Sequence, residues 1–175
     1  MNDEDLIALL RERAYLEGDF LLRSGKRSSY YLDKYRFETE PTLLGALGER
    51  IAAQASAEEP PDLLAGPELG AVALTAAASL ASGLPFLIVR SQAKDYGTAN
   101  RIEGVYEGGQ RVCLVEDVVT TGGAAVSAVE ALRSEGLECR RAVCVVDREE
   151  GGVDALARVA VRLHPLFRAA DVIST

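Results

Sequence analysis

Apolar and polar positions follow a helical period at the start of this chain and again near residue 50. From Leu6 to Leu16 the apolar residues recur at the three- and four-residue spacing of an amphipathic helix. A second helix is predicted from Leu43 to Ala57, with Pro41 in the first turn, where proline is tolerated. Between the two helices, the polar segment from Leu22 to Leu32 is expected to form a turn that leads into a short strand.

Beyond residue 60, short continuous apolar runs alternate with helical patterns. The runs predict strands at Leu63–Ala65, Phe86–Val89, Val112–Val115, Ala142–Val146 and Val159–Leu163. Helices are predicted between some of them, over Ala71–Ala81 and Ala124–Ser134. Apolar strands separated by helices are typical of a parallel sheet covered on both faces. We therefore predict an α/β fold in which residues 1–175 form one domain around a central, mainly parallel sheet flanked by helices.

One long stretch has no hydrophobic period. Residues from Ser91 to Gly109 are mostly polar, and glycines occur at both ends of the stretch. Loops of this length inside a compact domain are usually functional or mobile. We therefore expect residues 91–109 to be a flexible loop that takes part in the function.

The charge and composition exclude several classes of partner. The chain has a formal net charge of -8 and 48% apolar residues. An acidic chain of this kind is not expected to bind nucleic acid or an anionic membrane surface, because both require basic patches. No apolar run reaches the roughly 20 residues that span a bilayer, and the first residues are acidic, unlike a signal peptide. These features predict a cytoplasmic protein.

The cysteines and the histidine offer little for metal or nucleophilic chemistry. Cys113, Cys139 and Cys144 are odd in number, and their spacing fits neither a disulfide framework nor a zinc site. We expect buried, unreactive thiols. His164 is the only histidine of the chain, and we interpret it as structural.

The segment from Arg111 to Ala124 carries the clearest chemical signal. A buried strand ends in two carboxylates, Glu116 and Asp117, and the Thr/Gly-rich turn from Thr120 to Gly123 opens a helix. In open α/β sheets, ligands bind at the carboxyl ends of the strands. The turn can offer backbone N–H groups and the helix dipole to a phosphate, and the carboxylates can accept hydrogen bonds from sugar hydroxyls. Phosphate donors beside diol acceptors indicate a site for a ribose 5-phosphate.

The same residues resemble a known family. Val115–Gly123 (VEDVVTTGG) is similar to the phosphoribosyl-pyrophosphate motif of the type I phosphoribosyltransferases. Three further segments resemble the orotate phosphoribosyltransferase branch: Phe20–Asp33 the segment that closes over the base, Arg90–Gly104 the flexible catalytic loop, and Val146–Glu150 the strand end that supplies an arginine to orotate. The resemblance implies the type I phosphoribosyltransferase fold, with residues 1–40 as an N-terminal helix and small hood. It also implies transfer of ribose 5-phosphate from 5-phosphoribosyl-1-pyrophosphate to orotate in pyrimidine biosynthesis.

The resemblance also assigns roles to individual residues. Lys94, Glu116 and Asp117 are the expected catalytic residues, and Gly66–Gly70 resembles the short loop on the pyrophosphate side. The residues expected to bind phosphoribosyl pyrophosphate are Arg90, Lys94, Tyr96, Glu116, Asp117, Val118, Val119, Thr120, Thr121, Gly122, Gly123 and Ala124. Those expected to bind orotate are Thr120, Arg148, Tyr31 and Arg23. Mg²⁺ is the implied cofactor, held mainly by substrate and water with Asp117 as a candidate ligand. The implied assembly is a homodimer in which Lys94 reaches the neighbouring subunit's site.

Several alternatives stay open at this point. Many family members have Lys at the position of Ser91 and His at that of Tyr96, so the loop's division of labour differs here. Another base in place of orotate, or a non-catalytic sensor of phosphoribosyl pyrophosphate that binds nucleic acid, would also fit the phosphoribosyl-pyrophosphate motif. Asp33 and Lys34 are interpreted as a surface pair of little energetic importance. Tyr31 is as compatible with a packing role as with a place in the base site.

Overall fold

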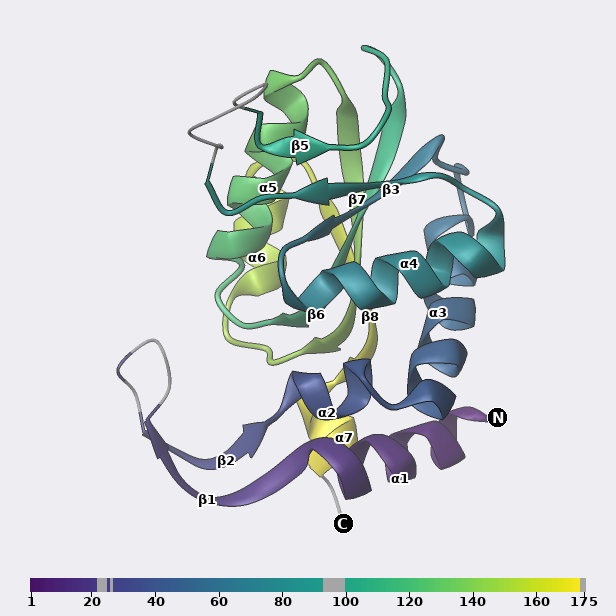
Figure 1. Ribbon diagram of the computed structural model, residues 1–175. Helices are drawn as coiled ribbons and strands as arrows, with labels where there is room; N and C mark the ends of the chain where they lie inside the picture. Colours follow the sequence, from purple (N-terminus) through teal and green to yellow (C-terminus); the bar gives the residue numbers. More distant parts are fainter. Residues whose placement is uncertain (22–24, 26, 93–99, 174–175) are drawn as a thin grey trace.

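A six-stranded sheet forms the centre of the molecule in the computed structural model, which describes residues 1–21, 25, 27–92 and 100–173 (Figure 1). The strand order is β5-β4-β3-β6-β7-β8, and β5 alone among these six runs antiparallel to its neighbour. The strands are β3 (Leu63–Pro67), β4 (Phe86–Val89), β5 (Ile102–Glu103), β6 (Arg111–Val119), β7 (Glu138–Asp147) and β8 (Arg162–Arg168). The parallel strands bring the carboxyl ends of β3, β4, β6 and β7 to one edge of the sheet.

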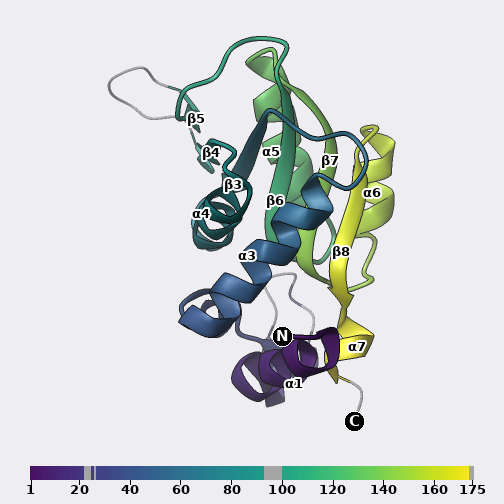
Figure 2. The ribbon, with the colours of Figure 1, turned by 90° about the vertical axis from the view of Figure 1, so that its right-hand side faces the viewer.

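Helices cover both faces of this sheet (Figure 2). On one face lie α3 (Pro41–Ala55) and α4 (Gly70–Ser82), which share a core with the N-terminal helix α1 (Asp3–Ala14). On the other face lie α5 (Gly123–Ser134) and α6 (Gly152–Arg158), around a second core. The apolar sheet is thus buried on both sides, as the continuous apolar runs of its strands require.

The N-terminal segment forms a separate unit below the sheet in Figure 1. It contains α1, an antiparallel hairpin of β1 (Tyr15–Leu21) and β2 (Arg27–Leu32), and the short helix α2 (Lys34–Glu38). The C-terminal helix α7 (Ala169–Ile173) contacts α1. This unit is fixed to the main core by buried apolar side chains such as Leu6 and Phe37.

The structure confirms the predicted parallel α/β architecture and both of its alanine-rich helices. It differs from the sequence prediction near the C-terminus, where Val159 follows α6 and the strand begins only at Arg162. β8 is an edge strand with exposed arginines at both ends and a proline in it, so its sequence lacks the apolar run of a central strand. The segment 91–109 also contains the short strand β5. None of the described helices is long and apolar enough to cross a membrane.

Candidate active site

Two acidic side chains lie buried near the carboxyl end of β6. Glu116 is 7% exposed and Asp117 is 5% exposed, so both carboxyls are largely removed from water. Burial and the neighbouring Asp117 raise the pKa of Glu116 to about 8, and its Oε1 has no hydrogen-bond partner among the described residues. Asp117 accepts a hydrogen bond from the backbone N–H of Val118 at 2.5 Å. A buried acceptor without a partner suits a ligand that brings hydroxyl donors.

Helix α2 brings two further charged side chains to this strand end. Lys34 donates to Asp117, with 2.5 Å between Nζ and Oδ2. The interpretation of Asp33 and Lys34 as a surface pair is therefore wrong: Asp33 pairs with Arg36, and Lys34 points into the site. Glu38 lies one turn after Lys34 and is 3% exposed. Burial and the nearby Asp117 raise the pKa of Glu38 to about 8.

The turn after β6 presents backbone N–H groups. Gly122 has φ +81°, in the left-handed region that favours glycine, and precedes α5 without a side-chain cap. Thr121, Gly123 and Ala124 are exposed and Thr120 is half-buried, so a ligand can reach the first turn of the helix. The first N–H groups of a helix lack intrahelical acceptors and carry the positive end of its dipole. The turn therefore has the properties of a phosphate site.

The position of this turn depends on α6 behind it. A Cβ added to Gly152, the first residue of α6, would lie 2.3 Å from Cγ1 of Val119 and 3.1 Å from the carbonyl oxygen of Thr120. The missing side chain lets α6 pack directly behind the turn. Val118 is half-buried and Val119 is buried, so the two valines fix the chain before the turn.

Arg148 follows β7, next to the carboxyl end of β6. Its backbone N–H donates to the carbonyl oxygen of Val119 at 2.9 Å, and its side chain is 8% exposed. The guanidinium donates from Nη2 to the Tyr30 hydroxyl at 3.1 Å and has Nε 3.0 Å from Oε1 of Glu150. Nε has no aligned hydrogen-bond acceptor among the described residues. This geometry holds a cation ready for a planar anionic ligand.

Arg90 lies at the end of β4, at the start of the long polar segment. Its Nη1 is 3.8 Å from Oε2 of Glu68, and its backbone N–H donates to the carbonyl oxygen of Arg101 at 2.7 Å. Ser91 donates to Glu68 from both its backbone N–H and its hydroxyl, each at 2.8 Å. These two hydrogen bonds, opposed by partial burial, lower the pKa of Glu68. Glu68 thus ties the Gly66–Gly70 loop to the start of the polar segment.

Some of the predicted site residues are not placed here. Lys94, Tyr96 and Arg23 lie outside the described residues. Tyr31 is 39% exposed and its ring packs on Phe20, with 5.6 Å between ring centroids. Among the described residues it is Tyr30, not Tyr31, whose ring and hydroxyl contact Arg148. Three residues that contribute to the described site were missed by the sequence interpretation, namely Tyr30, Lys34 and Glu38.

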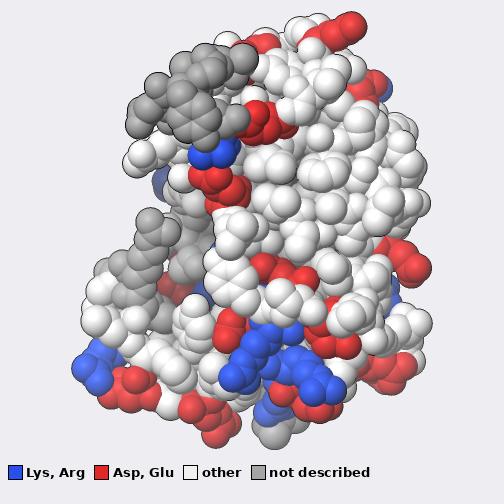
Figure 3. Space-filling view, viewed as in Figure 1, with Lys and Arg blue, Asp and Glu red and all other residues white. Residues whose placement is uncertain are grey.

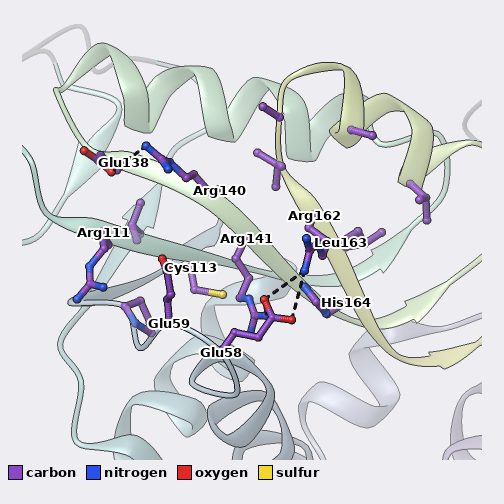
Figure 4. A pocket seen from close by; sticks show the side chains of 17 residues that line it. Glu58, Glu59, Arg111, Cys113, Glu138, Arg140, Arg141, Arg162, Leu163 and His164 are labelled. Atoms are coloured by element: carbon purple, nitrogen blue, oxygen red, sulfur yellow. Dashed lines mark hydrogen bonds and ion pairs between the residues drawn. The ribbon is translucent and has the colours of Figure 1, made fainter.

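A cavity of about 720 Å³ lies at the opposite end of the sheet, where β6, β7 and β8 begin (Figure 4). Some of its charged side chains pair with one another: Glu58 lies 2.9 Å from Arg141 and 3.2 Å from Arg162. His164 borders it, with Nδ1 3.2 Å from the Gln54 amide. This cavity lies at the amino ends of the strands, away from the carboxylates and the phosphate turn, so we do not assign the chemistry to it.

The charged surface agrees with a small-molecule site. In Figure 3, basic side chains gather at one place near the N-terminal helices and are bordered by acidic ones. The described part of this face carries no continuous basic surface of the kind that tracks a nucleic-acid backbone.

The three cysteines are buried, as expected from the sequence.

Comparison with known proteins relates this architecture to one family. The sequence model of the family named phosphoribosyl transferase domain matches residues 41–163 of this chain. The chain is 44% identical over 172 residues to the orotate phosphoribosyltransferase of Methanocella arvoryzae, covering 98% of this chain and 97% of the relative. It is 47% identical to that of Halobacterium salinarum, over 97% of this chain and 96% of the relative. Among solved structures, orotate phosphoribosyltransferase from Mycobacterium tuberculosis with Fe(III) dicitrate has a TM-score of 0.85 and 32% identity, covering 97% and 98% of the two chains.

Proposed function

The chain belongs to the orotate phosphoribosyltransferases of the phosphoribosyl transferase family, and we propose that its site residues divide into a ribose, a phosphate, a pyrophosphate and a base subsite. The enzyme transfers ribose 5-phosphate from phosphoribosyl pyrophosphate to orotate, a reaction of pyrimidine biosynthesis. The observation that carries the division is the position of Glu116 and Asp117 directly before the exposed first turn of α5. A ribose 5-phosphate is the ligand that needs diol acceptors beside phosphate donors.

In the reaction, the bond between the anomeric carbon and the pyrophosphate oxygen breaks, and its electron pair leaves with pyrophosphate. A ring nitrogen of the deprotonated base forms the new bond to the same carbon. No protein nucleophile is required, because the residues act by positioning and by electrostatic stabilisation. We assign Glu116 and Asp117 to the ribose hydroxyls, and Thr120 to Ala124, with the backbone of Val118 and Val119 before them, to the 5-phosphate.

The leaving group requires positive charge, because negative charge grows on pyrophosphate as the bond breaks. We assign Arg90, Lys94 and Tyr96 to the pyrophosphate subsite. The described geometry supports Arg90, since its Nε is buried without a hydrogen-bond partner among the described residues. Residues 91–109 would then close over the site and exclude water that would hydrolyse the sugar.

Arg148 is proposed to bind the orotate carboxylate, with Thr120, Tyr31 and Arg23 completing the base subsite. A guanidinium can form two parallel hydrogen bonds to a carboxylate, which uracil and hypoxanthine do not carry. The buried guanidinium of Arg148 supports this assignment, because its Nε–H has no aligned acceptor among the described residues although Glu150 lies 3.0 Å away.

Mg²⁺ is the proposed cofactor, and the residues present fit it. Mg²⁺ prefers oxygen ligands and usually keeps several waters, binding through one or two carboxylates and substrate phosphates. Asp117 and the unpartnered Oε1 of Glu116 offer such oxygens next to the proposed substrate. When bound, the metal would neutralise negative charge on pyrophosphate. We further propose a cytoplasmic homodimer of single-domain subunits, with residues 1–40 as the hood and Lys94 acting in the partner's site.

The test combines turnover with two variants. Purified protein is mixed with Mg²⁺, phosphoribosyl pyrophosphate and orotate, and the loss of orotate absorbance is followed. We expect turnover that collapses in Lys94→Ala, and an Arg148→Lys variant whose KM for orotate rises while its KM for phosphoribosyl pyrophosphate changes little. Turnover with hypoxanthine or uracil but not with orotate would contradict the base assignment.

A further inference from the structure

Lys34 connects the N-terminal unit to the proposed ribose subsite. Its ammonium lies 2.5 Å from Oδ2 of Asp117, although 83 positions separate the two residues in the sequence. The Asp117 side chain is 6% exposed and that of Lys34 is 32% exposed, so the pair is shielded from water on the carboxylate side. An ion pair in this position is stronger than one on an open surface.

The carboxylates around Lys34 explain why a cation is needed there. Glu38, Glu116 and Asp117 are all buried, and Lys34 pairs with Asp117 at 2.5 Å. The ammonium of Lys34 thus compensates the buried carboxylate of Asp117, which would otherwise lack a paired cation beside two further buried acidic side chains.

Gly70 places the same ammonium beside the loop on the pyrophosphate side. A Cβ added to Gly70 would lie 1.8 Å from Oδ2 of Asp117 and 2.6 Å from Nζ of Lys34. Gly70 is the first residue of α4 and the last of the Gly66–Gly70 segment. The absent side chain lets the ion pair lie directly against the backbone at the start of α4.

We infer that Lys34 is a positioning residue for phosphoribosyl pyrophosphate: it holds the Asp117 carboxylate where the ribose hydroxyls bind and adds a positive charge beside the pyrophosphate-side loop. This inference rests on the proposed function of the site. Lys34 acts through Asp117, so its loss affects the sugar substrate and leaves the base subsite around Arg148 in place. If the ion pair only fixed α2 to the sheet, its loss would lower the stability of the protein and would not change the KM of one substrate more than that of the other.

The three native cysteines make a direct rescue experiment possible. Burial raises the pKa of the thiols of Cys113, Cys139 and Cys144, so they are unreactive toward alkylation in the folded protein. A Lys34→Cys variant offers a partly exposed thiol, and 2-bromoethylamine converts it to an aminoethyl thioether by displacing bromide. The product restores an ammonium at nearly the length of lysine. Wild-type protein treated with the same reagent is the control for side reactions.

We expect Lys34→Met and untreated Lys34→Cys to raise the KM for phosphoribosyl pyrophosphate about tenfold or more, because the buried Asp117 loses its partner. The KM for orotate should stay within about threefold, and aminoethylation of Lys34→Cys should return the sugar-substrate KM to within about threefold of wild type. Arg36→Met is the matched control, since Arg36 lies on the same helix and pairs with Asp33 at 3.3 Å. Arg36→Met also removes one positive charge from α2, and we expect both KM values to stay unchanged.

An unchanged KM for phosphoribosyl pyrophosphate in Lys34→Met would overturn the inference, as would a defect that aminoethylation of Lys34→Cys leaves in place. Calorimetric titration with Mg²⁺ and phosphoribosyl pyrophosphate, without any base, separates this outcome from failure of the proposed function. Wild-type protein that binds the sugar more tightly than Lys34→Met but turns over no orotate would support the role of Lys34 while contradicting the base assignment.

Discussion

The guanidinium of Arg148 lies over the ring of Tyr30, with Cζ 4.9 Å from the ring centroid, and also donates to the Tyr30 hydroxyl at 3.1 Å. Tyr30 in turn stacks on Tyr15, with 5.8 Å between the centroids. The hairpin of the N-terminal unit therefore fixes the orientation of an arginine at the end of β7. Through this contact and that of Lys34 with Asp117, one short segment of chain reaches both the proposed base and ribose subsites.

Removing the Tyr30 hydroxyl should weaken orotate binding. Tyr30→Phe keeps the ring under Arg148 but deletes the acceptor, and we expect a loss of about 1 kcal/mol, or roughly a fivefold rise in the KM for orotate. Steady-state kinetics with each substrate varied in turn measures it. Tyr35→Phe, on the exposed side of α2, is the control. An unaltered orotate KM in Tyr30→Phe would mean that Glu150 alone orients Arg148.

Gly70→Ala tests the close approach of α4 to the ion pair. The new Cβ would overlap Oδ2 of Asp117, so either the carboxylate or the start of α4 must move. We expect the KM for phosphoribosyl pyrophosphate to rise about tenfold, since the new methyl group displaces the carboxylate that we propose as the ribose acceptor. Isothermal titration calorimetry with phosphoribosyl pyrophosphate alone measures the expected loss of affinity in the absence of orotate.

Gly45→Ala is the matched control for that substitution. Gly45 lies in α3, is exposed, and has open space where its Cβ would be. Alanine there should stabilise the protein by about 0.5–1 kcal/mol through its higher helix propensity and leave both KM values unchanged. If Gly70→Ala left both KM values unchanged, as expected for Gly45→Ala, the ion pair of Lys34 and Asp117 would not depend on its close approach to α4.

The buried carboxyl of Glu38 makes stability depend on pH. Its pKa is raised from 4.5 to about 8, so the folded state holds this proton more tightly than the unfolded state does. The resulting stabilisation is present below about pH 4.5 and is lost as the pH rises toward about 8. Glu38→Gln cannot ionise, so its free energy of unfolding should exceed that of wild type near pH 9 by on the order of 1–2 kcal/mol, and the difference should vanish near pH 5.

Urea unfolding at several pH values measures this difference. Glu49→Gln, an exposed position on α3, should show no pH-dependent difference from wild type. Glu116 has a similarly raised pKa, so the free energy of unfolding of Glu38→Gln should still depend on pH, but less steeply than that of wild type. A wild-type and a variant curve that run parallel from pH 5 to pH 9 would show that Glu38 ionises normally in the folded protein.

Local sequence signals predicted the part of the site that β6 and α5 form, but not the part that α2 contributes. β6, the turn and α5 are contiguous, so an apolar run, two carboxylates and a Thr/Gly turn were sufficient to predict that the carboxylates lie near an exposed helix start, where we propose the ribose and the phosphate to bind. Lys34 meets Asp117 only through tertiary packing of α2, and no pattern in the sequence joins residues so far apart. The i, i+4 spacing of Lys34 and Glu38 was the available signal, because it places both on one helix face.

One strand of the hairpin, β1, was missed for a similar reason. β1 is mostly exposed or half-buried along its length, so it lacks the apolar alternation of a core strand. β2 agrees with the short strand that was predicted after the polar turn: its burial alternates along the strand, and Tyr30 packs both on Arg148 and against the main core. The hydrophobic pattern therefore predicts β2 but not the strand with which it pairs.

The proposed sharing of Lys94 between subunits predicts complementation between two inactive variants. Lys94→Ala and Asp117→Asn should each be nearly inactive alone, because one lacks the proposed pyrophosphate contact and the other the proposed ribose contact. If Lys94 acts in the partner's site, a heterodimer contains one site with both residues intact and one site with neither. We therefore expect a mixture exchanged under mildly dissociating conditions to regain a measurable fraction of wild-type turnover, with Lys94→Ala mixed with itself as the control. Dimers that exchange subunits, as shown by mass spectrometry of differently tagged variants, yet remain inactive would place Lys94 in the site of its own subunit.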